Sequence, residues 1–285
     1  MSNMWYSDCS MDKFLRFLQT TMEEPKAGGA MHLTAIIAVI VLTALLCIFF
    51  RNADEKTFRV ILISIWSVMF LMEVLKQVSI SCIFAEDGTK TWHYDWGQFT
   101  LQLCDTPIYL LLPVAFVKNG KFRNALSTYM ATYILLGGIA TYAFPASIYS
   151  ISVYHNVHTL VHHGLQIASC LFIGIHNRKN LHLKSFLWAI VIFIISVGIA
   201  TVYNVVMHKL HPDQFINMFF ISPYFVKDVP EVVNAAWHKM HWMGRIGLYI
   251  GGVTVLAFII FLFYQLVCLR WRKDRTEPSQ TAEVA

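Results

Sequence analysis

The sequence contains little charge for its length. Only 14% of its 285 residues are Asp, Glu, Lys or Arg, whereas 56% are apolar. A soluble domain has about a quarter charged residues and about 45–50% apolar residues. This shortage of charge leaves too little polar surface to keep a globule dispersed in water. It argues against a soluble enzyme, a nucleic-acid reader and a disordered scaffold, and it favours a chain that is embedded in lipid.

Long apolar runs take the place of the missing charge. A bilayer core about 30 Å thick needs roughly 20 apolar residues per helix. Seven segments reach that length: Met31–Phe50, Arg59–Ile80, Gly97–Val117, Arg123–Phe144, Tyr154–Ile175, Ser185–Met207 and Met243–Cys268. The runs are continuous rather than alternating, which favours helices over a membrane barrel. The sequence therefore predicts an all-α, polytopic seven-helix transmembrane bundle over residues 31–268.

Lys and Arg are scarce in some connections and concentrated in others. They gather at residues 51–59, 118–123 and 178–184 and after Cys268, whereas Pro145–Ser152 has none. Short loops rich in Lys and Arg stay in the cytoplasm. We therefore expect the N-terminus to lie outside and the C-terminus to lie in the cytoplasm.

The ends of the chain and one long connection lack the features of a span. Residues 1–30 have no compact apolar core of a signal peptide, and they can form an extracytoplasmic lead-in with an interfacial helix. Residues 212–233 are broken by Pro223 and Pro230, so we expect an interfacial cover on the outer side. Residues 269–285 are basic and then polar, which is typical of a cytoplasmic tail.

Polar side chains inside the spans are the informative ones, because a charged group in hydrocarbon faces the bundle interior and finds a partner. Lys76 is expected to pair with Glu73, three residues before it. Two helical stripes are polar, and their members are Gln98, Gln102, Asp105 and Tyr109 in the third span, and His155, His158, His162 and Gln166 in the fifth.

These residues permit two kinds of enzyme site. In the first, Cys104 is a nucleophile, His162 or His163 is its general base, and Asp105 or Glu73 orients the imidazole. Cys104 and His163 lie at similar depths in spans that both begin outside. In the second, Asp105, His158 and His162 hold a zinc ion that supplies hydroxide inside the membrane.

The sequence lacks the residue arrangements that retinal binding and haem binding require. The seventh span has no lysine for a retinal Schiff base, and the histidines concentrate on one span instead of facing each other across two, which disfavours haem. A transporter or receptor lined by the same polar face is the non-enzymatic alternative.

The order of several short motifs resembles the YwaF-like integral membrane proteins of bacteria, which are related to the eukaryotic transmembrane protein 164 family. Thr100 stands where that family's signature has Pro, and Met218 stands where it has Tyr. The matching motifs, in chain order, are His32-Leu33, Glu73, Phe99–Cys104, His158 with His163-Gly164, Asn217–Ile221, and Gly244 with Tyr249.

The resemblance implies an intramembrane lipid acyltransferase or acyl hydrolase in a prokaryotic cell membrane, with phospholipids as substrates. The eukaryotic relatives are linked to acyl transfer onto ether phospholipids, through a Cys that corresponds to Cys104 and a His from a later helix. The resemblance therefore implies that Cys104 and His163 are the catalytic pair and that no cofactor is required. The supporting residues are then His158, His162, Glu73, Gln102 and Asp105.

Overall fold

The computed structural model describes residues 3–85, 87, 89–145, 148–226 and 231–273, without the side chains of residues 3–9, 231–233 and 268–273. Helices dominate this part of the chain. The longer ones are α1 (Asn3–Leu18), α2 (Ala30–Phe49), α3 (Glu55–Ser81), α4 (Thr106–Phe116), α5 (Lys121–Tyr129), α6 (Leu135–Ala143), α7 (Val153–His176), α8 (Leu183–Leu210), α9 (Glu231–Lys239) and α10 (Trp242–Lys273). The all-helical class predicted from the sequence is confirmed.

The shorter elements lie between these helices. A two-stranded antiparallel hairpin joins β1 (Cys82–Phe84) to β2 (Lys90–Trp92). Three 3₁₀ turns are η1 (Trp96–Gln98), η2 (Leu103–Asp105) and η5 (Met218–Phe220). A π-helical turn, η3 (Met130–Ile134), connects α5 to α6, so that these three elements run as one continuous helix with a bulge in its middle.

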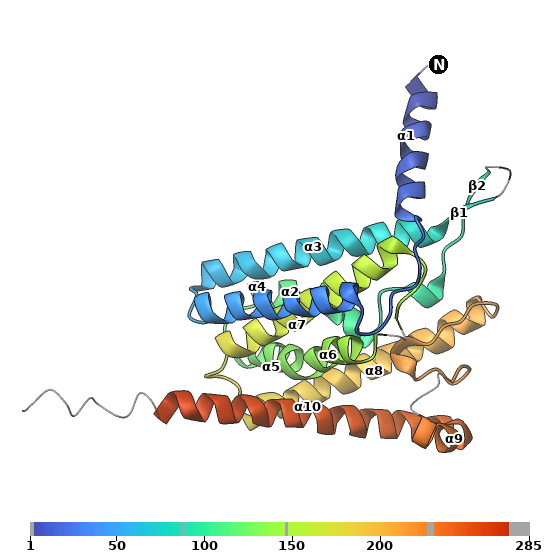
Figure 1. Cartoon of the computed structure of the whole chain (residues 1–285). Coiled ribbons are helices and arrows are strands. Elements are labelled where there is room, and N and C mark those ends of the chain that lie inside the picture. Colours follow the sequence, from blue (N-terminus) through green and yellow to red (C-terminus); the bar gives the residue numbers. More distant parts are fainter. Residues whose placement is uncertain (1–2, 86, 88, 146–147, 227–230, 274–285) are drawn as a thin grey trace, which may run out of the picture.

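The bundle helices lie side by side along one direction (Figure 1). α7 packs against α2, α3 and α6, and α8 packs against α5. One end of the bundle carries the β1–β2 hairpin, η1, η5 and α9, and we call it the hairpin end. The opposite end carries the α2–α3, α4–α5 and α7–α8 connections, and we call it the basic end. α1 projects away from the bundle at the hairpin end (Figure 1).

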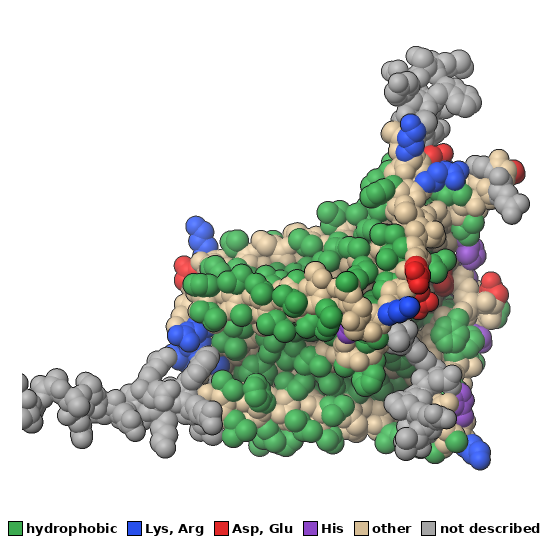
Figure 2. Space-filling view, in the orientation of Figure 1, with side chains coloured by type: hydrophobic (Ala, Val, Ile, Leu, Met, Phe, Trp, Pro, Cys, Tyr) green, Lys and Arg blue, Asp and Glu red, His purple; other side chains and the backbone are tan. Residues whose placement is uncertain are grey.

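Four helices are long and apolar enough to cross a membrane, namely α2, α3, α8 and the Trp242–Val267 part of α10. Large apolar side chains are exposed along them, as Ile37, Leu71, Ile195 and Ile259 illustrate. Figure 2 shows apolar side chains covering the long sides of the bundle. Such a continuous apolar surface is rare on soluble monomers and is typical of a surface covered by lipid. Membrane integration is therefore supported by both composition and structure.

The expected helix over Gly97–Val117 is wrong in its first third. After the short η1 turn the chain leaves the helix, the continuous helical part begins only at Leu103, and Gln102 occupies the position before it with an extended backbone. Gln102 and Asp105 form a reciprocal capping box, in which the Asp105 Oδ2 accepts from the Gln102 N–H at 2.9 Å. Pro107 then occupies the start of α4, where a missing N–H costs nothing. The four polar residues of the expected stripe therefore do not share one helix face.

Local capping fixes where other helices begin. The Asp54 Oδ1 accepts from the Thr57 N–H at 2.8 Å at the start of α3, and this hydrogen bond lowers the pKa of Asp54. The Ser152 hydroxyl accepts from the His155 N–H at 3.2 Å at the start of α7. These caps fix the residues at which α3 and α7 begin.

Candidate functional site

A buried carboxylate lies between α3, α7 and the irregular segment before η2. Glu73 is 4% exposed, and its Oε2 lies 3.0 Å from the His158 Nε2. Its Oε1 lies 2.7 Å from the Lys76 Nζ and accepts from the Gln77 Nε2 at 2.7 Å and from the Thr100 hydroxyl at 2.9 Å. Oε1 thus has three partners and Oε2 has one among the described residues. The expected pair of Glu73 and Lys76 is confirmed.

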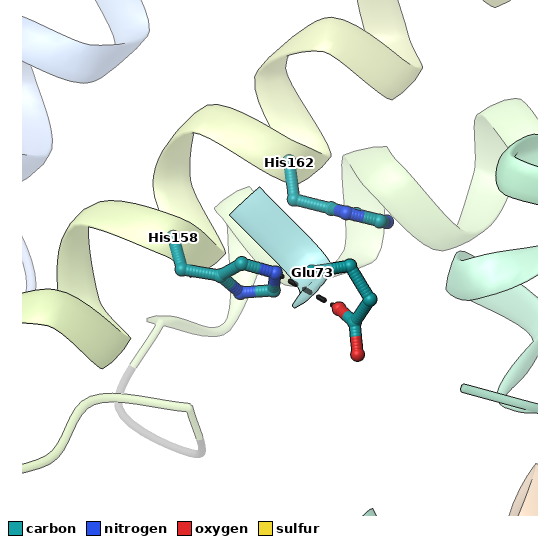
Figure 3. Close-up of side chains that lie close together, drawn as sticks. All are labelled: Glu73, His158 and His162. Carbon is teal, nitrogen blue, oxygen red and sulfur yellow. Dashed lines mark hydrogen bonds and ion pairs between the residues drawn. The ribbon is translucent and has the colours of Figure 1, made fainter. Parts of the chain in front are cut away.

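Two histidines of α7 point toward Glu73 (Figure 3). The rings of His158 and His162 lie one turn apart, with centroids separated by 5.3 Å. One ligand atom each of Glu73, His158 and His162 lies within 4.8 Å of the other two. Asp105 lies 4.0 Å from the His162 Nε2. The close group of possible ligands therefore contains Glu73 in the place that the zinc hypothesis gives to Asp105.

Cys104 lies in the first turn of the helix that continues into α4, directly beside the histidines of α7. The His162 Nε2 donates to the Cys104 carbonyl oxygen at 3.1 Å. On the α6 side, Gly137 lies next to Cys104, since a Cβ on that glycine would be in ordinary contact with the Cys104 Cα at 3.9 Å. The thiol is half-buried, and no hydrogen bond reaches it from the described residues.

The hydrogen bonds of the histidines determine which nitrogen carries the lone pair. His163 Nδ1 lies 2.7 Å from the Thr159 carbonyl oxygen, so Nδ1 carries the proton and Nε2 keeps the basic lone pair. His162 has the opposite arrangement, because its Nε2 is the donor to Cys104 and its Nδ1 is buried without a partner among the described residues. The rings of the two histidines lie 5.4 Å apart. The lone pair of His163 is thus on Nε2, and that of His162 is on Nδ1.

The backbone of the segment before Cys104 is not helical, and side chains from other positions satisfy its carbonyl groups. The Gln98 carbonyl accepts from the Gln77 Nε2 at 2.8 Å, and the Thr100 carbonyl accepts from the Tyr109 hydroxyl at 2.6 Å. Non-helical backbone at membrane depth is tolerated where protein satisfies its polar groups. Sequence reasoning missed Thr100, which it considered only as a replacement for Pro, although this residue donates to Glu73.

A loop near η5 covers the same region. The Gln102 Oε1 accepts from the Phe219 N–H at 2.8 Å, and its Nε2 donates to the Asn217 carbonyl at 3.1 Å. Asn204 of α8 clamps Met218 in the same two-ended manner, at 2.7 Å and 3.0 Å. Phe219 and Phe220 have φ angles of 56° and 59°, a left-handed conformation that is strained for aromatic residues. The two amide clamps hold this strained loop against the bundle.

Between the loop and the histidine region lies a partly open cavity of about 380 Å³. Its walls combine polar and aromatic side chains, among them Lys76, Gln98, Gln102, Asp105, Asn217, Phe99, Phe215 and Phe220. The Asn217 Nδ2 is buried and has no hydrogen-bond partner among the described residues. The cavity therefore gives polar groups of a ligand access to Asp105, the neighbour of Cys104.

The structure brings all seven candidate residues of the sequence analysis to this one region. Glu73 and His158 form its charged centre, Cys104, His162 and Asp105 lie beside it, His163 packs on His162, and Gln102 joins the cavity wall to the covering loop. The arrangement contains a thiol, several imidazoles and a buried carboxylate that His158, Lys76, Gln77 and Thr100 contact. Such a set can support nucleophilic chemistry or metal binding.

Comparison with known proteins gives one match. No curated protein and no solved structure matches the chain. The model of the TMEM164 family matches residues 27–265, a range that contains every residue of the candidate site. The narrower YwaF-like assignment stays a prediction. The chain belongs to the TMEM164 family.

Proposed function

We propose that this chain is an intramembrane acyltransferase or acyl hydrolase that acts on phospholipids, with Cys104 as nucleophile and His163 as base. The observation that carries the proposal is the hydrogen bond from the His162 Nε2 to the Cys104 carbonyl at 3.1 Å. It fixes the backbone of the one cysteine in this region against a row of imidazoles. A thiol needs a neighbouring base to become an effective nucleophile at neutral pH.

The proposed reaction has two half-reactions. The His163 Nε2 takes the proton of the Cys104 thiol, and the sulfur attacks the carbonyl carbon of a phospholipid acyl ester. The ester C–O bond breaks, and the departing lysophospholipid oxygen takes the proton back from the imidazolium. In the second half, the same imidazole removes a proton from a lipid hydroxyl or from water, whose oxygen attacks the thioester and releases the thiol.

The remaining residues have positioning roles in this proposal. Glu73 holds the His158 ring, and His158 packs on His162, which in turn supports Cys104 and His163. Gln102 and Asp105, which flank Cys104 in the sequence region before α4, line the cavity that would hold the polar part of a lipid. Such preorganisation matters because small displacements of reacting groups are costly to the rate.

We further propose that the bundle crosses a prokaryotic cell membrane seven times. The spans would be α2, α3, the 97–117 segment with α4, the α5–η3–α6 helix, α7, α8 and α10. The hairpin end would face outside, because the Lys and Arg residues of the short connections lie at the other end. With this orientation the lead-in of residues 1–30 and the 212–233 cover lie outside, and the C-terminal tail lies in the cytoplasm.

Turnover in phospholipid vesicles tests the proposed chemistry. Mass spectrometry would follow lysophospholipid and re-acylated lipid made by the wild type, Cys104→Ala, His163→Gln and Cys47→Ala. Cys47 is the matched control, because it is a half-buried free thiol on α2. We expect no turnover with Cys104→Ala, a loss of about 10²–10⁴-fold with His163→Gln, and wild-type turnover with Cys47→Ala. Equal turnover in the wild type and Cys104→Ala would discard the thiol as nucleophile.

The second candidate is a zinc-dependent lipid hydrolase, because one ligand atom each of Glu73, His158 and His162 lies within 4.8 Å of the other two. These three residues, in place of the predicted set with Asp105, would hold the metal, which would supply hydroxide near neutral pH. Metal analysis of purified wild type and His158→Ala separates the two candidates. One zinc per chain that is lost in His158→Ala, with turnover lost in parallel, would favour the metal. A metal-free chain with full turnover would exclude the zinc-dependent hydrolase.

Transport or ligand binding unaffected by Cys104→Ala would favour a polar-lined transporter or receptor.

A further inference from the structure

The basic end of the bundle has a strong excess of positive charge. Three connections meet there, and their only acidic residues are Asp54 and Glu55. Figure 2 shows Lys and Arg side chains gathered at this end, at the left of the view. The basic residues of these connections are Arg51, Lys56, Arg59, Lys118, Lys121, Arg123, Arg178, Lys179 and Lys184.

The two acidic residues are engaged elsewhere. The Asp54 carboxylate accepts the Thr57 N–H at 2.8 Å as the cap of α3. The Glu55 Oε2 pairs with the Arg123 guanidinium at 2.8 Å, and Arg123 also stacks over Phe58. Glu55 lines a smaller neighbouring pocket, but neither acid lines the cleft described next.

A cleft of about 430 Å³ lies between the α2–α3 and α7–α8 connections. It is lined by Arg51, Asn52, His176, Arg178 and Lys179. Lys179 and His176 also line a neighbouring pocket of about 100 Å³, which Asn177 shares. The Asn177 Nδ2 is buried and has no acceptor among the described residues. Glu55 and Arg123 line the neighbouring pocket as an ion pair, so the unused amide donor lies beside that pair, whereas the lining of the larger cleft contains basic and neutral side chains only.

Arg178 is held in a fixed position in this cleft. Its NH1 donates to the Arg51 and Ile175 carbonyls at 3.0 Å and 2.8 Å, and its NH2 donates to the Asn52 Oδ1 at 2.6 Å. These bonds tie the α7–α8 connection to the α2–α3 connection. A guanidinium that is ordered before binding loses less entropy when it meets an anion.

We propose that this cleft is a binding site for a phosphate group. Lys and Arg side chains and amide N–H groups are the usual ligands of phosphate, and basic pockets between membrane helices bind anionic lipid head groups. Sidedness of insertion explains why basic residues lie in these loops, but it does not require them to converge on one cleft around an ordered guanidinium. The site lies far from Cys104, because His158 and His176 are 18 residues apart on α7, or about 27 Å along the helix.

The phosphate can belong to an anionic phospholipid of the adjoining leaflet or to a soluble phosphate compound. The experiment uses the full-length protein in nanodiscs of phosphatidylcholine, with and without phosphatidic acid. Native mass spectrometry measures the phosphatidic acid that the protein retains. Inorganic pyrophosphate is titrated against the protein in phosphatidylcholine alone, with the melting temperature as readout.

The test variant is Arg51→Gln with Lys179→Gln, and the control variant is Lys121→Gln with Lys184→Gln. All four side chains are exposed at the same end of the bundle, and both variants remove two positive charges. The control residues do not line the cleft. Similar melting temperatures of the two variants without ligand would show that both are folded.

We expect the wild type to bind one of the two probes, with about tenfold weaker binding in the test variant because charge-assisted hydrogen bonds to phosphate are lost. The control variant should bind like the wild type. Retention of phosphatidic acid without an effect of pyrophosphate would identify the lipid as the source, and the reverse would identify a soluble phosphate. An equal loss in both variants, or no binding of either probe by the wild type, would overturn the site.

Discussion

At the scale of single residues, the Glu73 carboxylate joins three parts of the chain. It accepts from His158 on α7, from Lys76 and Gln77 on its own helix, and from Thr100 in the irregular segment. A buried charge persists only where such partners replace water. Glu73 is therefore central to how α7 is placed relative to Cys104.

The first prediction concerns this network. In Glu73→Gln the Lys76 ammonium, which is 8% exposed, loses its carboxylate and stays buried with its charge. Removal of one partner of a buried pair typically costs about 3–5 kcal/mol, so we expect a clear fall in melting temperature in detergent. Asp12→Asn is the control, because the Asp12–Lys90 pair is partly exposed and should contribute at most about 1 kcal/mol. Equal effects of the two substitutions would contradict the role given to Glu73.

The sequence predicts part of this network and misses another part. Helical spacing alone predicts that Lys76 reaches Glu73 and that His158 and His162 share a face, and both predictions are confirmed. The contact of Thr100 with Glu73 could not be predicted, because it depends on an irregular backbone that brings together residues 27 positions apart. The choice between His162 and His163 as base also depends on which carbonyl each ring faces.

At the scale of helices, apolar length predicts most of the bundle well. It fails for Gly97–Val117, where the Gln102–Asp105 capping box starts the helix later than hydropathy indicates. A helix can begin later than hydropathy indicates only if the backbone carbonyls before it find other donors. Here the Gln77 amide and the Tyr109 hydroxyl supply them. The π turn of η3 is likewise set by packing, since all of its residues are buried.

Close helix contact gives a prediction at this scale. Gly174 on α7 faces the Tyr264 ring of α10, and a Cβ at this position would lie 2.5 Å from the Tyr264 hydroxyl oxygen. Gly174→Ala should therefore displace the Tyr264 ring from α7 and cost about 1–3 kcal/mol. Gly198→Ala on α8 is the matched control, because nothing lies within 4 Å of its Cβ. The melting temperatures of both variants in detergent provide the check. A Gly174→Ala protein as stable as Gly198→Ala would show that the two helices are not in this contact.

At the scale of the whole molecule, the exposed apolar sides and the charged ends define how the bundle sits in a bilayer. Lys and Arg of the short connections lie at the basic end, and the hairpin, the 217–221 loop and the 380 Å³ cavity lie at the other. The sequence predicts this polarity from loop charge alone. It does not reveal that the covering loop is held by Gln102 and Asn204, because those contacts are remote in sequence.

Sidedness is directly measurable. Thr91→Cys at the hairpin and Lys184→Cys at the basic end place new thiols at exposed positions on opposite ends of the bundle. With Cys9 replaced by Ser in both variants, a membrane-impermeant maleimide added to intact cells should label the first and leave the second unlabelled until the membrane is opened. Labelling of Lys184→Cys alone would reverse the orientation, and labelling of both would contradict a bundle that spans the membrane.

The most direct test of the proposed chemistry is to locate the covalent acyl group. The protein would be incubated with phosphatidylcholine vesicles, quenched in acid and digested, and the peptide containing Cys104 would be analysed by mass spectrometry. We predict that this peptide gains the mass of a fatty acyl group, which hydroxylamine removes as expected for a thioester. Lipid turnover without any acyl group on Cys104, or with the acyl group on another residue, would contradict the account.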